Sequence, residues 1–494
     1  MTQSIALNST SGARFVERWA QVRPDAPAII DDHECLSFAA LEQRVSDTAK
    51  AMIDAGLGRG ARLAVVGGNG AETAITLLGV WRAGATAALV NERLAQAEQE
   101  RLIAFADVAG VLSCETPDGP AALQRRDPAL DDIAPAHGDA ALILFTSGTT
   151  GAPKGVMLTH DNLDFVAHGI AERRAIGPGD RAFAALPLTH AFGLTSVLLG
   201  SLCAGASVRI ASRFDPAEAI AELESGDVTL FNGVPTMFAR LCDTLEARSA
   251  PLGSTTLRFI GCGGSPLRPA LVDRVNRWLR LPLHSGYGMS EAGPTITMTD
   301  GADDPSNAGV GYPLAGVSLS IRDAVGHAMA DGYSGEVFVR SPGVMRGYFR
   351  APELSREAVD ADGWLRTGDL GQLDGNGALH LLGRQKEMII RSGFNVYPLE
   401  IEAQVEDDPA VEQCAVVGYP DGDNEGIALF IKLRDGGALD AVLARLSTQI
   451  APYKRPTRTI AVSVFPTTLA GKVIKSLLVD RIRVPSGLDV GPED

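Results

Sequence analysis

The chain has 494 residues, of which 45% are hydrophobic, and it carries a formal net charge of −16. This length exceeds that of one typical domain, so we expect two or more domains, each with an apolar core. The excess of negative charge argues against nucleic acid or an acidic membrane surface as a partner, because both would repel the protein.

Nothing in the sequence indicates export or insertion into a membrane. Residues 1–12 are polar and lack the apolar segment of a signal peptide. The uncharged stretch 191–208 contains glycines and hydroxyls, and we expect a buried helix that leads into a strand. None of the 6 cysteines forms a C-x-x-C pair, which predicts reduced, mostly buried thiols in a cytoplasmic protein and neither a zinc site nor disulfides.

Strand-like apolar runs alternate with helical stretches over the first two thirds of the chain. The clearest series cover residues 62–66, 71–83 and 86–90, and then residues 206–210, 216–224 and 228–231. This alternation predicts β-α-β units and therefore parallel sheets. From about residue 309 to 382, short β-rich segments are separated by Gly and Asp turns, which predicts a small antiparallel section. The tail after Pro485 is rich in Gly, Pro and Asp and is expected to fray.

A glycine- and hydroxyl-rich loop follows the apolar run 140–145. Its sequence, T-S-G-T-T-G-A-P-K-G, spans residues 146–155. Glycines allow backbone N–H groups to approach phosphate, hydroxyls add donors and a lysine adds positive charge. Pro153 stands where a Walker A loop would need Gly, so that type of loop is excluded. A flexible linker is less favoured, because linkers rarely follow a buried strand. The predicted phosphate ligands are Thr146, Ser147, Gly148, Thr149, Thr150 and Lys154.

This loop resembles the phosphate-binding signature of the adenylate-forming superfamily, which includes acyl-CoA synthetases and aryl-CoA ligases. Four further segments resemble the motifs of that superfamily, in the same order. They are G-Y-G-M-S-E-A-G-P at 286–294, W-L-R-T-G-D-L at 364–370, the segment from G-R-Q-K-E at 383–387 to E-I-E at 400–402, and the segment from Pro466 to G-K at 471–472. The resemblance covers nearly the whole chain.

The resemblance implies an α/β fold with two domains. A large N-terminal domain of α/β sheets, with AMP-binding function, would span residues 1–384 and include a small β-rich section at 309–384. A small, mobile α+β lid domain would span residues 385–494 and carry a catalytic lysine. The implied reaction has two steps: a carboxylate reacts with ATP to give acyl-AMP and pyrophosphate, and a thiol, usually that of coenzyme A, then displaces AMP.

The resemblance also implies nucleotide-binding roles. Ser290, where the superfamily usually has Thr, would donate to the α-phosphate, and Glu291 would bind Mg²⁺. Tyr287 would stack on adenine, and Asp369 would accept hydrogen bonds from ribose with support from Arg384. Taken alone, Tyr287 also fits ordinary core packing and Asp369 an ordinary turn. Gly264 is a further predicted contact of the nucleotide.

Four other residues match positions of the superfamily that act on the acid or move the lid. Lys472 would bridge the attacking carboxylate and the α-phosphate. Lys386 matches the hinge position and Gly393 would leave room for the pantetheine arm of coenzyme A. His190, in P-L-T-H, would stand beside the acyl site, although a lone His is more often a core residue. The chain departs from the superfamily pattern at Glu387, usually Asp, and at Thr467-Thr468, usually Arg-Thr.

The predicted acyl pocket is apolar, which favours an aromatic or medium-chain acid. A malonyl-type dicarboxylate is less favoured: residues 233–240 resemble malonyl-CoA synthetases, but Phe192 stands where those enzymes generally have a second His. The predicted pocket residues are Phe192, Gly193, Asn232, Gly233, Gly261, Gly263, Gly286, Met289 and Pro294.

Three functions stay open at this point. The first is a CoA ligase that uses ATP, Mg²⁺ and coenzyme A. The second is a stand-alone adenylation enzyme that loads a separate carrier protein. The third, a non-catalytic nucleotide-binding protein, is disfavoured by the presence of Lys154, Glu291, Asp369 and Lys472. The oligomeric state, a homodimer included, is also left open.

Overall fold

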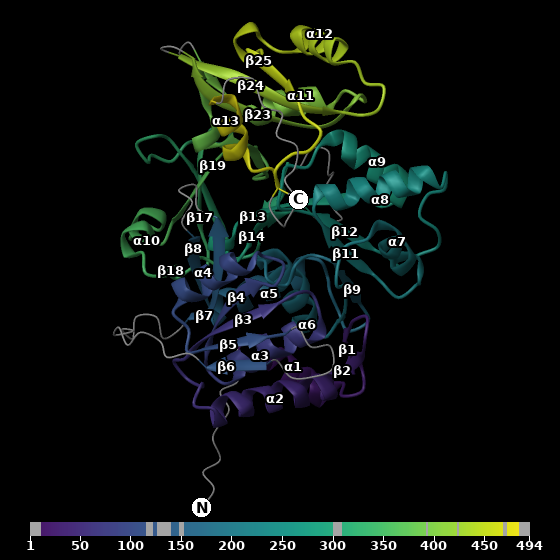
Figure 1. The fold of residues 1–494 in the computed structure, drawn as a ribbon, viewed down its shortest axis with the longest axis vertical. Helices are drawn as coiled ribbons and strands as arrows, with labels where there is room; N and C mark the ends of the chain where they lie inside the picture. Colours follow the sequence, from purple (N-terminus) through teal and green to yellow (C-terminus); the bar gives the residue numbers. More distant parts are fainter. Residues whose placement is uncertain are drawn as a thin grey trace, which may run out of the picture.

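The computed structural model describes residues 11–114, 122–125, 140–147, 153–299, 309–391, 394–421, 424–467 and 472–483. The tail that was expected to fray lies outside these residues. The described strands form sheets of nine, seven, four, three and two strands. In Figure 1 the C-terminal part, drawn in yellow-green, lies above the large sheets and beside helix α9 (Pro269–Leu279).

The seven-stranded sheet has the order β18-β8-β7-β4-β3-β5-β6. Its centre is parallel, because β3 pairs with both β4 and β5, and β4 pairs with β7, in the same direction. The predicted β-α-β unit at residues 62–90 is therefore confirmed, with α3 (Ala71–Arg82) as its helix. The strands are β3 (Arg62–Gly67), β4 (Thr86–Asn91), β5 (Gly110–Ser113), β6 (Ala122–Arg125), β7 (Ala140–Ser147), β8 (Pro153–Thr159) and β18 (Gly347–Tyr348).

The nine-stranded sheet has the order β15-β14-β13-β12-β11-β9-β10-β1-β2 and is parallel from β13 to β1. The helix predicted at residues 216–224 is α7 (Pro216–Glu224). It begins at Pro216 because the Asp215 side chain caps the first turn and proline is suited to the first helical position. The strands are β1 (Pro27–Ile30), β2 (Cys35–Ser37), β9 (Arg181–Ala184), β10 (Ser207–Ile210), β11 (Leu230–Gly233), β12 (Phe259–Cys262), β13 (Leu283–Gly288), β14 (Thr295–Met298) and β15 (Tyr312–Pro313).

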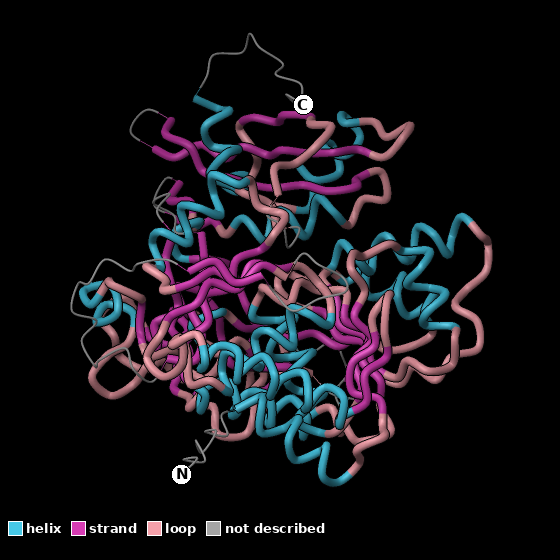
Figure 2. Tube along the Cα trace, turned by 60° about the horizontal axis from the view of Figure 1, so that its bottom comes forward, coloured by secondary structure: helices cyan, strands magenta, loops and turns pink. Residues whose placement is uncertain are grey.

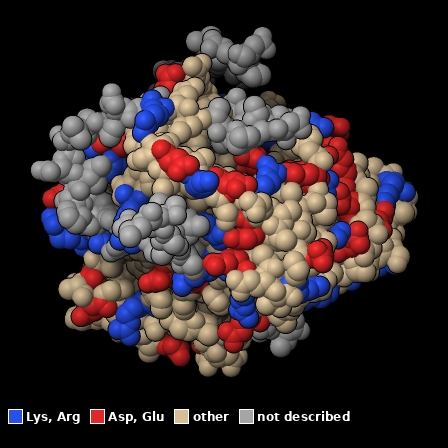
Figure 3. All heavy atoms as spheres, turned by 90° about the horizontal axis from the view of Figure 1, so that it is seen from below, with Lys and Arg blue, Asp and Glu red and all other residues tan. Residues whose placement is uncertain are grey.

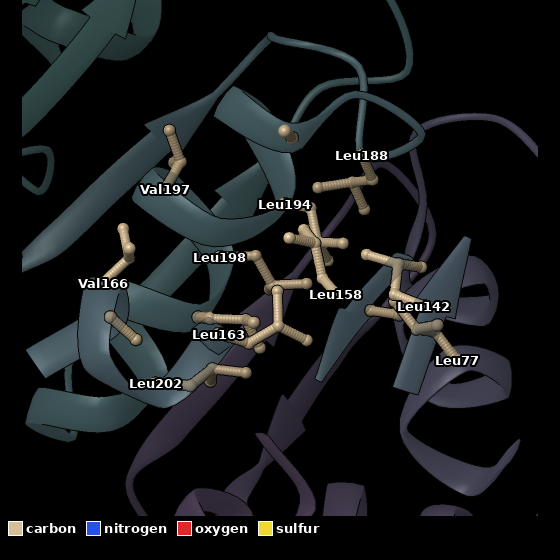
Figure 4. Close-up of a cluster of buried hydrophobic side chains, with 14 of the residues drawn as sticks. Leu77, Leu142, Leu158, Leu163, Val166, Leu188, Leu194, Val197, Leu198 and Leu202 are labelled. Carbon is tan, nitrogen blue, oxygen red and sulfur yellow. The ribbon is translucent and has the colours of Figure 1, made fainter. Parts of the chain in front are cut away.

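One apolar core joins the two large sheets. Figure 4 shows Leu142 of β7 and Leu158 of β8 near Leu163 of α5 (His160–Arg173) and Leu194 of a π-helix, η2 (Phe192–Leu199). The same cluster reaches Leu230 of β11. The predicted buried helix within residues 191–208 is confirmed, and it continues through α6 (Gly200–Ala204) into β10, but its π form was not predicted. Within the described parts of the chain, every helix is too short or too polar to cross a membrane.

Further helices cover the outer faces of the two sheets. Helices α7, α8 and α9 pack against the nine-stranded sheet, and α4 packs against the seven-stranded sheet. Helices α1 and α2 pack near α3 at the base of the molecule, as Figure 1 shows. The bounds of these helices are Ser11–Val22 for α1, Phe38–Asp54 for α2, Gln96–Ala106 for α4 and Pro235–Ala247 for α8.

The predicted β-rich section forms a four-stranded antiparallel sheet of order β16-β17-β19-β20. A short helix, α10 (Pro352–Ala358), and strand β18 interrupt it, and β18 joins the seven-stranded sheet instead. The strands are β16 (Ser318–Arg322), β17 (Gly335–Arg340), β19 (Leu365–Leu373) and β20 (Leu379–Arg384).

The residues after β20 form a smaller α+β unit with apolar clusters of its own. A hairpin, β21 (Ile389–Arg391) and β22 (Phe394–Val396), precedes a three-stranded sheet of β23 (Val411–Asp421), β24 (Asn424–Leu433) and β25 (Arg458–Ala461). In Figure 2 these strands form a layer with helices along it. The helices are α11 (Pro398–Glu406), α12 (Leu439–Gln449) and α13 (Lys475–Arg483). The predicted fold class, a large α/β domain with a smaller C-terminal domain, is confirmed. The boundary after residue 384 and the mobility of the lid stay predictions.

All six cysteines are free, and four of them, Cys203, Cys242, Cys262 and Cys414, are buried. Burial raises the pKa of these thiols, which keeps them protonated and unreactive. On the face seen in Figure 3, acidic and basic side chains are interspersed over the described surface. The prediction that the cysteines are mostly buried is confirmed, since four of the six are buried.

Trp81 provides a test of how α3 is attached to the seven-stranded sheet. Its ring is fully buried and its Nε1 donates to the carbonyl of Ala141 on β7, at 2.8 Å. Trp81→Phe removes the donor, leaves the carbonyl unpaired and opens a cavity. We expect a loss of about 2–4 kcal/mol in the free energy of unfolding, measured by denaturant titration. Trp278 is only partly buried, so Trp278→Phe should lower the free energy of unfolding by less than Trp81→Phe does. Equal losses in the two variants would contradict the contact assigned to Trp81.

Candidate active site

Several of the predicted site residues lie at one edge of the nine-stranded sheet, where the parallel strands β11, β12 and β13 end. Ligands of parallel sheets bind at this carboxyl edge because the loops that leave the strands project there. Asn232 and Gly261 are partners in adjacent strands, as are Gly261 and His284. Ser290 and Glu291 follow β13 directly, in a short 3₁₀ helix, η3 (Ser290–Ala292).

The phosphate loop connects β7 to β8 as a hairpin. Thr146 pairs with Lys154, and Ser147 pairs with Pro153, so the two ends of the loop are adjacent. Gly148, Thr149 and Thr150 lie outside the described residues. The ammonium of Lys154 lies over the ring of Tyr348, 5.1 Å from its centroid, which is a cation–π contact.

Tyr348 links the phosphate loop to Glu291, a role that the sequence did not predict. Its hydroxyl donates to Glu291 Oε1 at 2.9 Å, and the backbone N–H of Met345 donates to the Glu291 carbonyl at 2.8 Å. Burial and the Glu291 charge raise the pKa of Tyr348, so the phenol keeps its proton. The segment M-R-G-Y-F-R around Tyr348 gave no signal, because an aromatic residue after glycine has many structural uses.

The surroundings of Glu291 fit a magnesium ion held together with phosphate. Its Oε2 accepts no hydrogen bond from the described residues, while Oε1 is held by Tyr348. No group of three or more His, Cys, Asp or Glu side chains in the described part of the chain could form a complete metal site. Mg²⁺ commonly binds to one or two carboxylates, substrate phosphates and water, so a single carboxylate beside a phosphate loop suits it.

A second group of contacts surrounds Asp369. Tyr287 donates its hydroxyl to Asp369 Oδ2 at 2.6 Å, and Arg384 Nε lies 3.2 Å from Oδ1. Asp369 and Arg384 are cross-strand partners in β19 and β20, which explains their contact. Burial, followed by the charge of Asp369, raises the pKa of Tyr287. The ring of Tyr287 lies within the main core, and its stacking on adenine stays a prediction.

Two more residues hold the strand that carries Asp369. Glu336 is buried and accepts from Arg366 Nε at 2.9 Å and from the backbone N–H of Gly368 at 3.2 Å. Thr367 donates to the Val337 carbonyl at 2.7 Å. These contacts orient the turn before Asp369. Glu336 was also missed by the sequence analysis, because it lies about thirty residues upstream of the motif that it supports.

The C-terminal part brings Lys472 to this group of residues. Lys472 is partly buried, and its pKa is lowered by burial first and then by the nearby charge of Arg384, against the opposing charges of Glu387 and Asp369. Its neighbour on α13, Lys475, pairs with Glu387 at 2.8 Å and with Glu402 at 2.9 Å. Lys386 lies in a 3₁₀ turn, η4 (Gln385–Glu387), directly after β20. Gly393 lies outside the described residues.

Most of the predicted acyl residues lie on the inner face of β11–β13 or at the start of η2, but Gly233 faces outward, where an added Cβ would lie 3.2 Å from Phe238. The Phe192 ring lies over Gly263, where an added Cβ would be 3.2 Å from the ring. Gly193 is tightly enclosed, since its Cβ would be 2.3 Å from the Pro187 carbonyl oxygen. His190 is exposed, and its Nδ1 accepts from the Phe192 N–H at 3.3 Å. Although the His190 side chain reaches solvent, the protein atoms around its ring desolvate it and lower its pKa, which keeps the ring neutral at pH 7.

The remaining predicted contacts belong to the loops at the ends of β12 and β13. Gly264 has a φ of +83°, a left-handed conformation that favours glycine. Met289 donates its N–H to the Pro294 carbonyl at 2.9 Å, which closes the loop around Ser290 and Glu291. Gly233 is the last residue of β11, and Gly286 lies within β13, before its last residue, Gly288.

Comparison with known proteins assigns the class. The AMP-binding enzyme family matches residues 16–349, and the AMP-binding enzyme C-terminal domain matches residues 400–472. Feruloyl-CoA synthase of Amycolatopsis sp is 35% identical over 481 residues, covering 93% of this chain and 96% of that protein. Indoleacetate–CoA ligase of Aromatoleum aromaticum is 33% identical over 500 residues, covering 94% of this chain and 96% of that protein.

Solved structures agree with this assignment. ATP-bound MatB from Rhodopseudomonas palustris has a TM-score of 0.85 at 28% identity, covering 95% of this chain and 99% of that chain. The o-succinylbenzoate CoA synthetase of Bacillus subtilis, in complex with its acyl-adenylate, has a TM-score of 0.82 at 25% identity, covering 94% of this chain and 97% of that chain. The fold and site define an adenylate-forming architecture. The chain belongs to the AMP-binding enzyme family, and the resemblance drawn from the motifs is confirmed.

Gly288 tests the loop that holds Ser290 and Glu291. An added Cβ would lie 2.0 Å from the Pro294 carbonyl oxygen, a backbone atom that cannot move without opening the loop. Gly288→Ala should therefore lower the free energy of unfolding by about 1–3 kcal/mol, measured by denaturant titration. Gly375→Ala is the matched control, because its Cβ would meet nothing within 4 Å. A Gly288→Ala protein as stable as this control would refute the described packing.

Proposed function

We propose that the protein is an ATP-dependent acyl-CoA ligase that converts an apolar carboxylic acid, aromatic or medium-chain, to its CoA thioester. The observation that carries this proposal is the convergence of three groups at one sheet edge: Lys154 with Tyr348 and Glu291, Tyr287 with Asp369, and Lys472 from the C-terminal part. Its curated relatives include CoA ligases that cover more than nine tenths of the chain.

In the proposed reaction, a carboxylate oxygen of the acid forms a bond to the α-phosphorus of ATP as the bond to pyrophosphate breaks. The thiol sulfur of coenzyme A then bonds to the acyl carbon, AMP leaves with the electron pair of the broken C–O bond, and the thiol proton passes to solvent. Both steps bring anions together, so catalysis consists largely of neutralising charge and positioning the reactants.

The first step is assigned to donors and cations from three elements. Lys154 and the hydroxyls of the loop would hold the β- and γ-phosphates, and Ser290 would donate to the α-phosphate. Glu291 would hold Mg²⁺, which supplies charge neutralisation at the phosphates when bound. Asp369, which Tyr287 and Arg384 hold in place, would accept hydrogen bonds from the ribose hydroxyls. Lys472 would stabilise the negative charge between acid and α-phosphate.

The second step is assigned to the lid, residues 385–494. Lys386 would be the hinge, and Gly393 would leave space for the pantetheine arm. The ion pair of Lys475 with Glu387, two groups that both follow the proposed boundary, would let the hinge segment move together with the lid. The free, mostly buried cysteines support a cytoplasmic location.

An apolar acid is favoured by the residues proposed to line the acyl site. None of Phe192, Gly193, Asn232, Gly261, Gly263 and Gly286 carries a charge, and a second carboxylate would need a cation to replace its hydration. The similarity to MatB therefore supports the fold and the nucleotide site rather than a dicarboxylate substrate.

Product analysis tests the reaction class. With ATP, Mg²⁺ and a panel of aromatic and medium-chain acids, the purified protein should release pyrophosphate and form AMP, because an adenylating enzyme breaks the α–β bond. With coenzyme A added, mass spectrometry should detect the acyl thioester. Stoichiometric ADP and orthophosphate would rule out the proposal, and acyl-AMP that turns over only with a carrier protein would favour the carrier-loading alternative.

Lys472 gives a test that separates the two steps. Lys472→Ala should lower the rate of acyl-AMP formation by about 10²–10³-fold, the effect of removing one charge-stabilising donor. Thioester formation from supplied acyl-AMP should be retained, because this step does not require the lysine. The protonated form of Lys472 carries the charge, and its pKa is lowered from the ordinary lysine value of 10.5. Adenylation by the wild type should therefore decline as the pH rises, with a midpoint below 10.5.

Lys472→Arg provides the control for the pH dependence. Arginine keeps its charge throughout this range, so the alkaline decline assigned to Lys472 should disappear even if the rate is reduced. Rates should be measured as pyrophosphate release between pH 7 and pH 11, with thermal melts at each pH. Equal loss of both steps in Lys472→Ala would contradict the assignment.

A further inference from the structure

One arginine of the large domain makes direct contact with the C-terminal part. Arg268 stands immediately before α9, and its guanidinium forms an ion pair with Glu406 of α11. Its Nη1 also donates to the carbonyl of Glu402, at 2.9 Å. Both acceptors belong to the C-terminal half of α11, and the C-terminal end of a helix dipole favours a cation. These contacts join the start of α9 to the part of the chain that lies beside it in Figure 1.

Both sides of this contact are oriented by their own neighbours. Arg268 precedes Pro269, which restricts its backbone to the extended conformation that it adopts. Glu406 Oε1 accepts from the backbone N–H of Cys414 at 2.8 Å, so β23 orients the carboxylate. The side chains of Arg268 and Glu406 are 25% and 12% exposed. A charge-assisted contact between oriented, largely buried groups is stronger than an ordinary surface ion pair.

The helix that Arg268 contacts also holds the segment that carries Lys472. Glu402 of α11 is buried, and its Oε1 accepts from the backbone N–H of Val416 at 2.7 Å. The same oxygen lies 2.9 Å from the ammonium of Lys475. Lys475 is the first residue of α13 and follows Lys472 by three residues. A continuous series of contacts therefore runs from Arg268 through α11 and Lys475 to the segment of Lys472.

We propose that Arg268 is a positioning residue for the first step of the reaction: it docks α11 against the start of α9 and so holds Lys472 where adenylation needs it. This inference rests on the proposed function, in which Lys472 acts in adenylation and not in thioester formation. Arg268 acts through α11 and Lys475 and has no role of its own in binding the reactants.

The charge of Glu406 explains why docking depends on Arg268. Burial raises the pKa of Glu406, and the positive charge of Arg268 opposes this effect. Without the guanidinium, the docked lid would hold a largely buried carboxylate that has lost its cation, which is unfavourable. Movement of α11 away from α9 would return the carboxylate to water, so the docked arrangement would become less populated.

Arg268→Gln tests the proposal by removing the charge and keeping a polar side chain. The single-turnover rate of acyl-AMP formation should fall about 5- to 30-fold, with KM for ATP and acid changed by less than about 3-fold, because the large domain keeps its binding residues. Thioester formation from supplied acyl-AMP and coenzyme A should be retained, since this step does not require Lys472. Arg268→Lys keeps the charge but not the forked geometry and should recover part of the rate.

Glu406→Gln removes the other side of the same ion pair and keeps an acceptor for the Cys414 N–H. It should lower the rate of acyl-AMP formation by a similar factor. The double variant Arg268→Gln/Glu406→Gln should be little slower than Arg268→Gln alone, because both changes remove one shared contact. Thermal melts check that each variant folds.

Arg274→Gln is the matched control. Arg274 lies on the same helix, its side chain is 23% exposed, and it pairs with Asp243 at 2.7 Å and with Glu246 at 2.8 Å. Both carboxylates belong to α8 of the large domain. This variant therefore removes ion pairs that do not involve the lid, and it should leave both steps unchanged.

Limited digestion with trypsin measures docking without the reaction. Residues 384–391 join the two parts of the chain and contain Arg384, Lys386 and Arg391 as cleavage sites. Cleavage within this segment should be faster by about 3-fold or more in Arg268→Gln and Glu406→Gln, because an undocked lid leaves the segment more accessible. Cleavage of Arg274→Gln should match the wild type.

The outcomes separate this inference from the proposed function. If the wild type releases no pyrophosphate with any acid, but Arg268→Gln and Glu406→Gln are cleaved faster, the docking by Arg268 stands and the proposed function fails. If wild type and Arg268→Gln form acyl-AMP at rates within about 2-fold, the proposed function stands and the role of Arg268 fails. Equal loss of both steps in Arg268→Gln, or unchanged cleavage by trypsin, also overturns the proposal.

Discussion

The buried carboxylate of Asp369 is the group on which the arrangement of the site depends. A carboxylate taken out of water must be hydrogen-bonded or paired with a cation, or it loses its charge. Its partners come from different sheets: Tyr287 from the nine-stranded sheet and Arg384 from the antiparallel section. The same charge acts on Lys472 from the C-terminal part. One anion thus connects three parts of the chain at the point where the nucleotide is proposed to bind.

Much of the architecture could be predicted from local sequence, because local physics determines it. Helix α7 begins at the position indicated by the capping residue Asp215 and by Pro216. The β-α-β unit of β3, α3 and β4 follows from the alternation of apolar runs with a helical stretch. The π-helix η2 could not be predicted, since a fully apolar run has no periodicity that separates one helical form from another. The pairing of the two-residue strand β18 with β8 joins segments almost two hundred residues apart and leaves no local signal.

Site residues could be predicted from the sequence only where several functional residues stand close together in a short motif. Glu291, Asp369 and Lys472 were found in this way, and their neighbourhood in the structure supports the proposal although their roles stay predictions. Tyr348 was missed because its importance lies in two contacts, with Lys154 and Glu291, that are distant in sequence. Asn232 was predicted only as one residue of an apolar pocket. Its amide oxygen is buried with no hydrogen-bond partner among the described residues, a feature that no sequence pattern expresses.

The two faces of strands β11–β13 carry different kinds of side chain. The outer face is filled with large apolar side chains, including Phe231, Ile260 and Leu283, which pack against helices α7, α8 and α9. The inner face has glycine at residues 261 and 286, where a strand would normally bury apolar groups. Glycine in a strand contributes no packing and weakens it, so the outer face has to hold the sheet together. Because side chains alternate between the two faces of a strand, three short strands can present large apolar groups outward and glycine inward.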